Sequence, residues 1–166
     1  SLVDTEMYCR RYNSNTETWS SVTRLTEDVV PDQNARVVVD GSGQITVVWN
    51  RDGGLVMQKN LMGAVSLVRE NTGGIGFADM TLTAGPSGKM VLLWQEASEH
   101  GSDARYRVYD PVSETWGKDA LLTQDPDLER SFAPAWDSNG NLVMAYNSVE
   151  TLFETKNVEV EGGGMV

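Results

Sequence analysis

The chain of 166 residues is long enough for one domain with a core, and its 40% hydrophobic and 22% charged content is typical of a globular protein. Its net charge of −11 excludes nucleic acid as a natural partner, because an acidic surface repels phosphates. The single cysteine, Cys9, excludes an intrachain disulfide, and no apolar run is long enough for a membrane span.

Short strands and turns follow one another along the chain. Residues 1–28 predict two strands joined by a hairpin with the sequence E-T-W, and no signal peptide is visible in the sequence. Residues 35–70 and 78–124 each predict four strands, while residues 132–166 predict two. Period-2 alternation and β-branched runs support these strands, and no capped helical pattern is present. The sequence therefore predicts an all-β chain of antiparallel strands.

A repeat connects these units. Three turns align on Gly43, Gly88 and Gly140, at spacings of 45 and 52 residues. RRYNSNTETWSSVTRLT, residues 10–26, aligns with RVYDPVSETWGKDALLT, residues 107–123, at an offset of 97. The same offset joins Gly43 to Gly140. Four-stranded units of about 40 to 50 residues predict β-propeller blades.

Particular positions have expected places in such blades. The three aligned glycines are expected in tight turns at positive φ. A further tight turn is expected at residues 60–63, where the outer hairpin is shorter. Pro134 suits an inner edge strand, because proline donates no hydrogen bond. The aromatic side chains that close the second strand of each unit are expected to be buried between blades; they are Trp49, Trp94 and Tyr146. Cys9 is expected to be a buried, unreactive thiol.

DGSGQITVVW, NRDGG, RYRVYDPVSETW and DSNGNLVMAY carry a family resemblance. In this order they resemble the repeats of large bacterial surface and secreted proteins. The resemblance implies a propeller of the sialidase-like group, a binding or scaffolding role, and an extracellular or cell-surface location. The Asp-box pattern S-x-D-x-G-x-x-W is not reproduced, so the resemblance does not extend to sialidase activity.

The strand count predicts about three blades within a single domain of residues 1–166. Residues 1–28 supply outer strands and residues 132–166 supply inner strands, with TKNVEVE at 155–161 as a candidate third strand. Three blades cannot close a ring, because propellers have about four to eight. The chain is therefore expected to be part of a larger propeller, or half of a six-bladed ring formed by two copies. A homodimer is the predicted partner state.

Acidic and basic side chains on the loops of one end of the propeller are the candidate ligand face. They are Arg51, Asp52, Glu96, His100, Asp127, Glu129 and Arg130. A lone histidine supports neither a Ser-His-Asp relay nor a histidine-rich metal centre, and no cofactor motif is present. DSNGN is interpreted as a β-turn rather than a calcium loop, because the further ligands of such a loop are missing. No catalytic residue, metal or cofactor is assigned.

Three functions remain open at this point. The first is a non-catalytic module that binds carbohydrate or protein, or acts as a scaffold. The second is part of a carbohydrate-active enzyme that uses two loop carboxylates, which glycosidases require. The third is a self-assembly module whose chief contact is its own copy. Two close carboxylates with an arginine in a pocket would favour the enzyme, and a dry apolar contact between copies would favour assembly.

Overall fold

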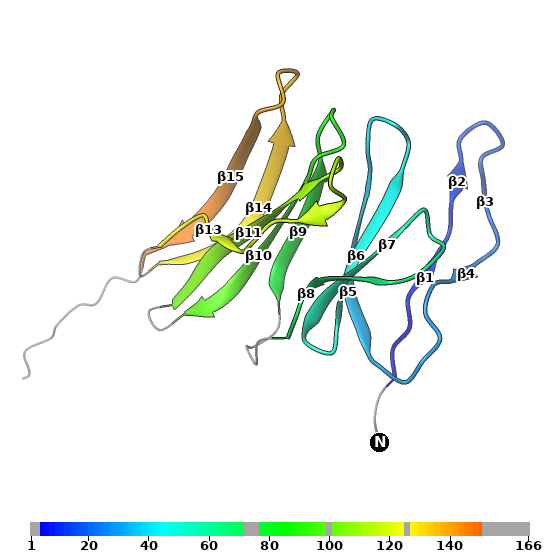
Figure 1. Cartoon of the computed structure of the whole chain (residues 1–166), viewed down its shortest axis with the longest axis horizontal. Helices are drawn as coiled ribbons and strands as arrows, with labels where there is room; N and C mark the ends of the chain where they lie inside the picture. The colour runs from blue at the N-terminus through cyan, green and yellow to red at the C-terminus, as the bar shows by residue number, and fades with distance from the viewer. Residues whose placement is uncertain (1–3, 72–76, 99–100, 125–126, 151–166) are drawn as a thin grey trace, which may run out of the picture.

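The computed structural model describes residues 4–71, 77–98, 101–124 and 127–150, and every regular element in these ranges is a β-strand (Figure 1). In chain order the strands are β1 (Tyr8–Cys9), β2 (Tyr12–Asn13), β3 (Thr18–Trp19), β4 (Thr23–Arg24), β5 (Asp32–Val39), β6 (Ile45–Arg51), β7 (Gly54–Lys59), β8 (Ser66–Arg69), β9 (Ala78–Ala84), β10 (Met90–Ser98), β11 (Gly101–Asp110), β12 (Thr115–Trp116), β13 (Ala120–Leu121), β14 (Leu128–Trp136) and β15 (Leu142–Val149). The prediction of an all-β chain is confirmed. Over these same ranges, no helix could cross a membrane.

The strands form four sheets. One has four antiparallel strands in the order β5-β6-β7-β8. A seven-stranded sheet runs β15-β14-β11-β10-β9, with β12 and β13 also paired to β11. The pairs β1-β4 and β2-β3 are two-stranded sheets. All pairings are antiparallel except that of β11 with β14, which is a single residue pair, Ser102 with Leu128. The large sheet therefore divides naturally into β9–β13 and the β14–β15 hairpin.

The repeat offset of 97 residues appears directly in the backbone pairing. Tyr8 pairs with Arg24 in the first unit, and the residues 97 positions later, Arg105 and Leu121, also pair. Tyr12–Trp19 and Tyr109–Trp116 are equivalent pairs in the two outer hairpins. The N–H groups of Met7 and Ala104 donate to the hydroxyls of Thr26 and Thr123, at 2.9 and 3.0 Å. The first unit thus has the conformation of the outer strands of β9–β13.

The glycine turns are as predicted. Gly43, Gly88 and Gly140 have φ of 84, 79 and 81°, and their turns project from one end of the molecule (Figure 1). A side-chain carboxylate closes two of them. Asp40 Oδ1 accepts from the N–H groups two and four residues later, and Asp137 Oδ1 does the same. DSNGN is therefore a turn, as expected. Residues 60–63 also form the expected turn, with three of the four at positive φ.

Each first strand contains a feature that the sequence analysis missed. Asn34, Asp79 and Ser131 have φ of 55, 44 and 60° and are separated by the same 45 and 52 residues as the glycines. At all three positions the strand pairing shifts register by one residue. These are β-bulges, in which an additional residue bends the strand. We call them the three inner bulges.

Side chains between neighbouring sheets form the core. The largest cluster joins β6–β8 to β9–β11, a second joins β10–β11 to β14–β15, and a third joins β6–β7 to the N-terminal unit. Trp49 and Trp94 are fully buried, which confirms their predicted place. Tyr146 is 43% exposed, so its predicted burial is wrong: no described strand pairs with the outer edge of β15. Cys9 is half-buried rather than buried, for it lies on an unpaired edge as well.

Candidate binding surfaces and ion-pair groups

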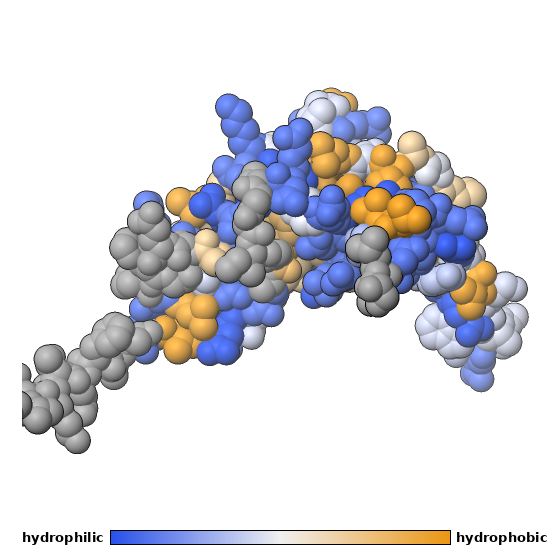
Figure 2. All heavy atoms as spheres, turned by 90° about the horizontal axis from the view of Figure 1, so that it is seen from below, coloured by the Kyte–Doolittle hydropathy of each residue, from blue (hydrophilic) through white to orange (hydrophobic). Residues whose placement is uncertain are grey.

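The predicted ligand face lies at the end of the molecule opposite the glycine turns. The loops from β4 to β5 and from β6 to β7 meet there (Figure 1). Seen from this side, the surface is mostly hydrophilic, with separate hydrophobic patches (Figure 2). Asp52 lies exposed in the β6–β7 turn and Arg130 lies exposed on β14, while His100 falls outside the described residues.

Arg51, at the end of β6, belongs to a buried group of ion pairs. Its Nε donates to Asp32 Oδ1 at 2.7 Å, and its Nη2 donates to Asp32 Oδ2 at 2.8 Å. The same Nη2 reaches Asp28 Oδ2 at 2.9 Å, and Trp49 Nε1 donates to Asp32 Oδ1 at 2.7 Å. Burial alone would raise the pKa of Asp32, but hydrogen bonds, above all from Arg51, lower it below its ordinary value. Asp32 is therefore a fixed carboxylate that orients its two donors.

Glu96 belongs to a second group, centred on Arg69 of β8. Arg69 Nη2 donates to Glu96 Oε1 at 2.7 Å, and its Nε donates to Asp119 Oδ2 at 2.7 Å. Arg105 Nε lies 2.5 Å from Glu96 Oε2, and Arg107 pairs with Asp119. Two carboxylates and three guanidinium groups thus join β8 to the neighbouring sheet.

The central arginine of this group, Arg69, also packs against two aromatic rings. The Arg69 guanidinium lies 5.0 Å from the ring centroid of Phe77 and 5.4 Å from that of Trp94. Burial would lower the pKa of Arg69, but its hydrogen bonds to Asp119 and Glu96 raise it. Burial would raise the pKa of Asp119, but its hydrogen bonds with Arg107 and Arg69 lower it. The charges of this group hold two sheets together.

Asp127 and Glu129 lie at the start of β14, apart from both groups. Asp127 Oδ2 accepts from the Ser148 hydroxyl at 3.2 Å. Glu129 is fully buried and accepts from the Thr123 hydroxyl at 3.0 Å. Glu129 lies 97 residues after Asp32, so two of the three repeat units bury one acid at the start of a first strand, whereas Phe77 has this place in the middle unit. The structure therefore distributes the predicted ligand residues over separate structural groups.

This arrangement has little capacity for acid–base chemistry. A glycosidase needs one carboxyl group that holds a proton and a second that is ionised. The pKa values of Asp32 and Asp119 are lowered, so neither is suited to be the carboxyl group that holds a proton, and Glu96 lies in ion pairs with Arg69 and Arg105. Within the described ranges, no three His, Cys, Asp or Glu side chains are placed to hold a metal ion.

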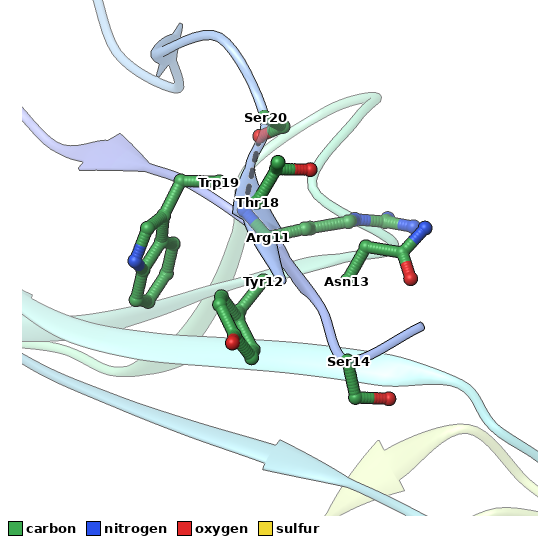
Figure 3. A pocket seen from close by; sticks show the side chains of 7 residues that line it. All are labelled: Arg11, Tyr12, Asn13, Ser14, Thr18, Trp19 and Ser20. Carbon is green, nitrogen blue, oxygen red and sulfur yellow. Dashed lines mark hydrogen bonds between the residues drawn. The ribbon is translucent and has the colours of Figure 1, made fainter. Parts of the chain in front are cut away.

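A different surface stands out on the β2–β3 hairpin. Tyr12 and Trp19 lie side by side on it, with ring centroids 5.3 Å apart and planes inclined at 54°. They are 52% and 58% exposed. Arg11 points away from the two rings, and its backbone N–H donates to the Ser20 hydroxyl at 3.0 Å (Figure 3). The Arg10 guanidinium lies 5.9 Å from the centroid of the Trp19 ring. The hairpin therefore presents an open aromatic pair.

The second repeat contains the same aromatic pair in a covered form. Tyr109 and Trp116 also lie 5.3 Å apart, with planes inclined at 57°. Tyr109 is only 1% exposed, because β7 covers the hairpin. Trp116 Nε1 donates to Met57 Sδ at 3.2 Å, and Lys59 Nζ lies 5.1 Å from the centroid of the Tyr109 ring. In this second pair, Tyr109 is buried and Trp116 is partly buried beneath β7.

Sequence reasoning found Arg51 and Glu96 but missed the acids and the arginine that bind them. Counting the strands back from the Gly43 turn would place Gln33 opposite Arg51, and the bulge at Asn34 brings Asp32 there instead. Arg69 and Asp119 come from different sheets, and no local pattern predicts their contact. Comparison with known proteins found no family model and no curated protein that matches the chain.

Proposed function

We propose that this chain is a non-catalytic scaffolding module built of β-propeller-like blades, which acts by packing its two open ends against further blades. The sheets β5–β8 and β9–β13 would be complete blades. The unit β1–β4 would be the outer half of a blade, and the β14–β15 hairpin would be the inner half. An extracellular or cell-surface location stays a prediction.

The aromatic pair carries this proposal. Tyr12–Trp19 and Tyr109–Trp116 share one geometry, but only the second pair has a sheet packed against it. Exposed aromatic rings of this size mark interaction sites, since covering them contributes strongly to binding. The lowered pKa values of Asp32 and Asp119 argue against these two acids as the proton donor that the enzymatic alternative requires.

An apolar dye that fluoresces on exposed hydrophobic surface tests the proposal. At dilute concentration the chain should bind the dye, and Tyr12→Ser/Trp19→Ser should bind clearly less with an unchanged thermal midpoint. Val29→Ser/Val112→Ser is the matched control, because it also removes two exposed apolar side chains but away from the pair. No dye binding, together with a lowered midpoint of the double variant, would show that the rings serve only this chain's own folding.

The catalytic alternative needs its own measurement. Chromogenic glycosides should not be turned over by the purified chain. Turnover that disappears in Glu96→Gln, with stability retained, would overturn the assignment as a non-catalytic module.

A further inference from the structure

Two strand edges are open where their counterparts in the repeat are paired. β6 and β10 pair on both sides, whereas β15 pairs with β14 alone in the described part of the chain. β11 pairs with β10 along nine residue pairs. In the described residues, β1 pairs only with β4, and β2 pairs only with β3. In the described residues, one end of the chain therefore has inner strands alone, and the other end has outer strands alone.

The repeat offsets assign a register between these two edges. Leu93 pairs with Tyr106 in the complete sheet. Ala145 lies 52 residues after Leu93, and Cys9 lies 97 residues before Tyr106. In the same way, the pair of Met90 with Tyr109 corresponds to Leu142 with Tyr12. Resting on the proposed scaffolding function, we propose that β15 of one copy pairs with the β1–β2 edge of a second copy, Ala145 opposite Cys9, and that two copies close into a ring.

The faces beside these edges are apolar and uncovered in the same positions. Val143 on β15 is 63% exposed, whereas Val91, its counterpart 52 residues earlier, is 3% exposed. Val37 and Val39 on β5 are exposed too, and with Ile45 they line a groove of about 270 Å³ between β5–β6 and the N-terminal unit. In the proposed ring, β14–β15 of the second copy enters this groove, and its outward face covers the β5 valines.

Completeness favours a second copy as the occupant, because each copy has the strands that the open edge of the other copy is missing in the described residues. A second copy would pair with both open edges at once. Two copies together would then contain four complete sheets and two further sheets formed by strands of both copies. A two-fold closed arrangement also leaves no free edge for further growth. The segment 155–161 of the same chain would complete only one edge.

The native cysteine makes the register testable through Ala145→Cys. Residues directly opposite in antiparallel strands have Cα atoms about 4.5 to 5.5 Å apart, within the range a disulfide bridges. Under an added oxidant, glutathione disulfide, Ala145→Cys should form a covalent dimer of twice 18.2 kDa about tenfold faster than Val143→Cys or Asn147→Cys. Ala145→Cys/Cys9→Ser should form none, and sedimentation equilibrium under reducing conditions should show a dimer of the unchanged chain.

Several results would overturn this contact. Equal crosslinking at the three positions would refute the register, and a covalent ladder beyond the dimer would refute the two-fold closure. A monomer that dimerises only after removal of residues 151–166 would show that the chain's own segment occupies the edge. Dye binding without self-association would leave the scaffolding function standing and refute only the second copy as the occupant. Absence of both dye binding and self-association would refute both proposals.

Discussion

Replacing Trp49 tests the packing between sheets most directly, because its side chain is fully buried and its Nε1 donates to the buried carboxylate of Asp32 at 2.7 Å. A buried aromatic side chain hides about 150 to 250 Å², which at about 25 cal/mol per Å² corresponds to about 4 to 6 kcal/mol. Measured losses for Trp→Ala in cores are about 3 to 5 kcal/mol. We therefore expect Trp49→Ala to lower the free energy of unfolding by about 4 kcal/mol.

Trp49→Phe separates the ring from the hydrogen bond. Phenylalanine keeps most of the apolar volume but loses the N–H donor to a charged acceptor, a bond worth about 1.5 to 3 kcal/mol. The expected loss is about 2 to 3 kcal/mol, between the wild type and Trp49→Ala.

Urea unfolding followed by far-UV circular dichroism measures both losses without relying on tryptophan fluorescence. For a chain of this size, the Trp49→Ala loss should lower the thermal midpoint by about 8 to 16 °C. Val112→Ala, at a highly exposed position, is the control and should stay within about 0.5 kcal/mol of the wild type. A loss below about 1 kcal/mol for Trp49→Ala, with an unchanged denaturant slope, would refute the assignment of Trp49 to a core between two sheets.

Three further substitutions test the turn and the ion pairs. Gly43→Ala should cost about 1 to 2 kcal/mol in urea unfolding for purely backbone reasons, since φ is +84° and no atom lies within 4 Å of the added Cβ; a neutral result would contradict the left-handed turn. Folding lowers the pKa of Asp32, so its contribution to stability is present above the unfolded pKa, near 3.8, and is lost as the pH falls through the lower folded value. Acid titration of the unfolding free energy should therefore show a shallower decline in Asp32→Asn than in the wild type, and equal slopes would exclude a folded-state ion pair. Arg69→Ala should cost about 2 kcal/mol, because it leaves Glu96 and Asp119 each with one fewer partner. Arg69→Lys should recover less than half of that loss, as one ammonium cannot reproduce the planar fork, and full recovery would refute that reading.

Much of the fold could be predicted because it depends on local chemistry. Gly43 and its two counterparts indicate turns at positive φ, which few other residues tolerate. The fully buried Trp49 and Trp94 belong to apolar runs that indicate strands covered on both faces. Tyr146 occupies the same place in the repeat, yet its burial depends on a strand beyond the β15 edge. The repeat pattern describes a position in a complete unit, whereas burial depends on which units are present.

The candidate site was harder to predict, because it depends on contacts between sheets. The pairing of Arg51 with Asp32 lies within one hairpin but depends on the bulge at Asn34, which shifts the strand register by one residue. The pairing of Arg69 with Asp119 joins residues 50 positions apart on different sheets. The three inner bulges left a weak signal. Asn34 and Asp79 belong to the residue types that most readily adopt a positive φ, whereas a serine such as Ser131 does not indicate this conformation.

The three inner bulges have a consequence for how the protein stays in solution. β5 and β9 lie at the edges of their sheets, and β14 contacts a neighbour on its far side at one residue pair only. A straight, unpaired edge recruits strands from other molecules and leads to amyloid-like aggregation, whereas a bulged edge is a poor template. The bulges at Asn34, Asp79 and Ser131 thus protect these edges against pairing with strands of other molecules. We expect that deleting one of these residues would straighten its edge and promote the formation of amyloid-like fibres.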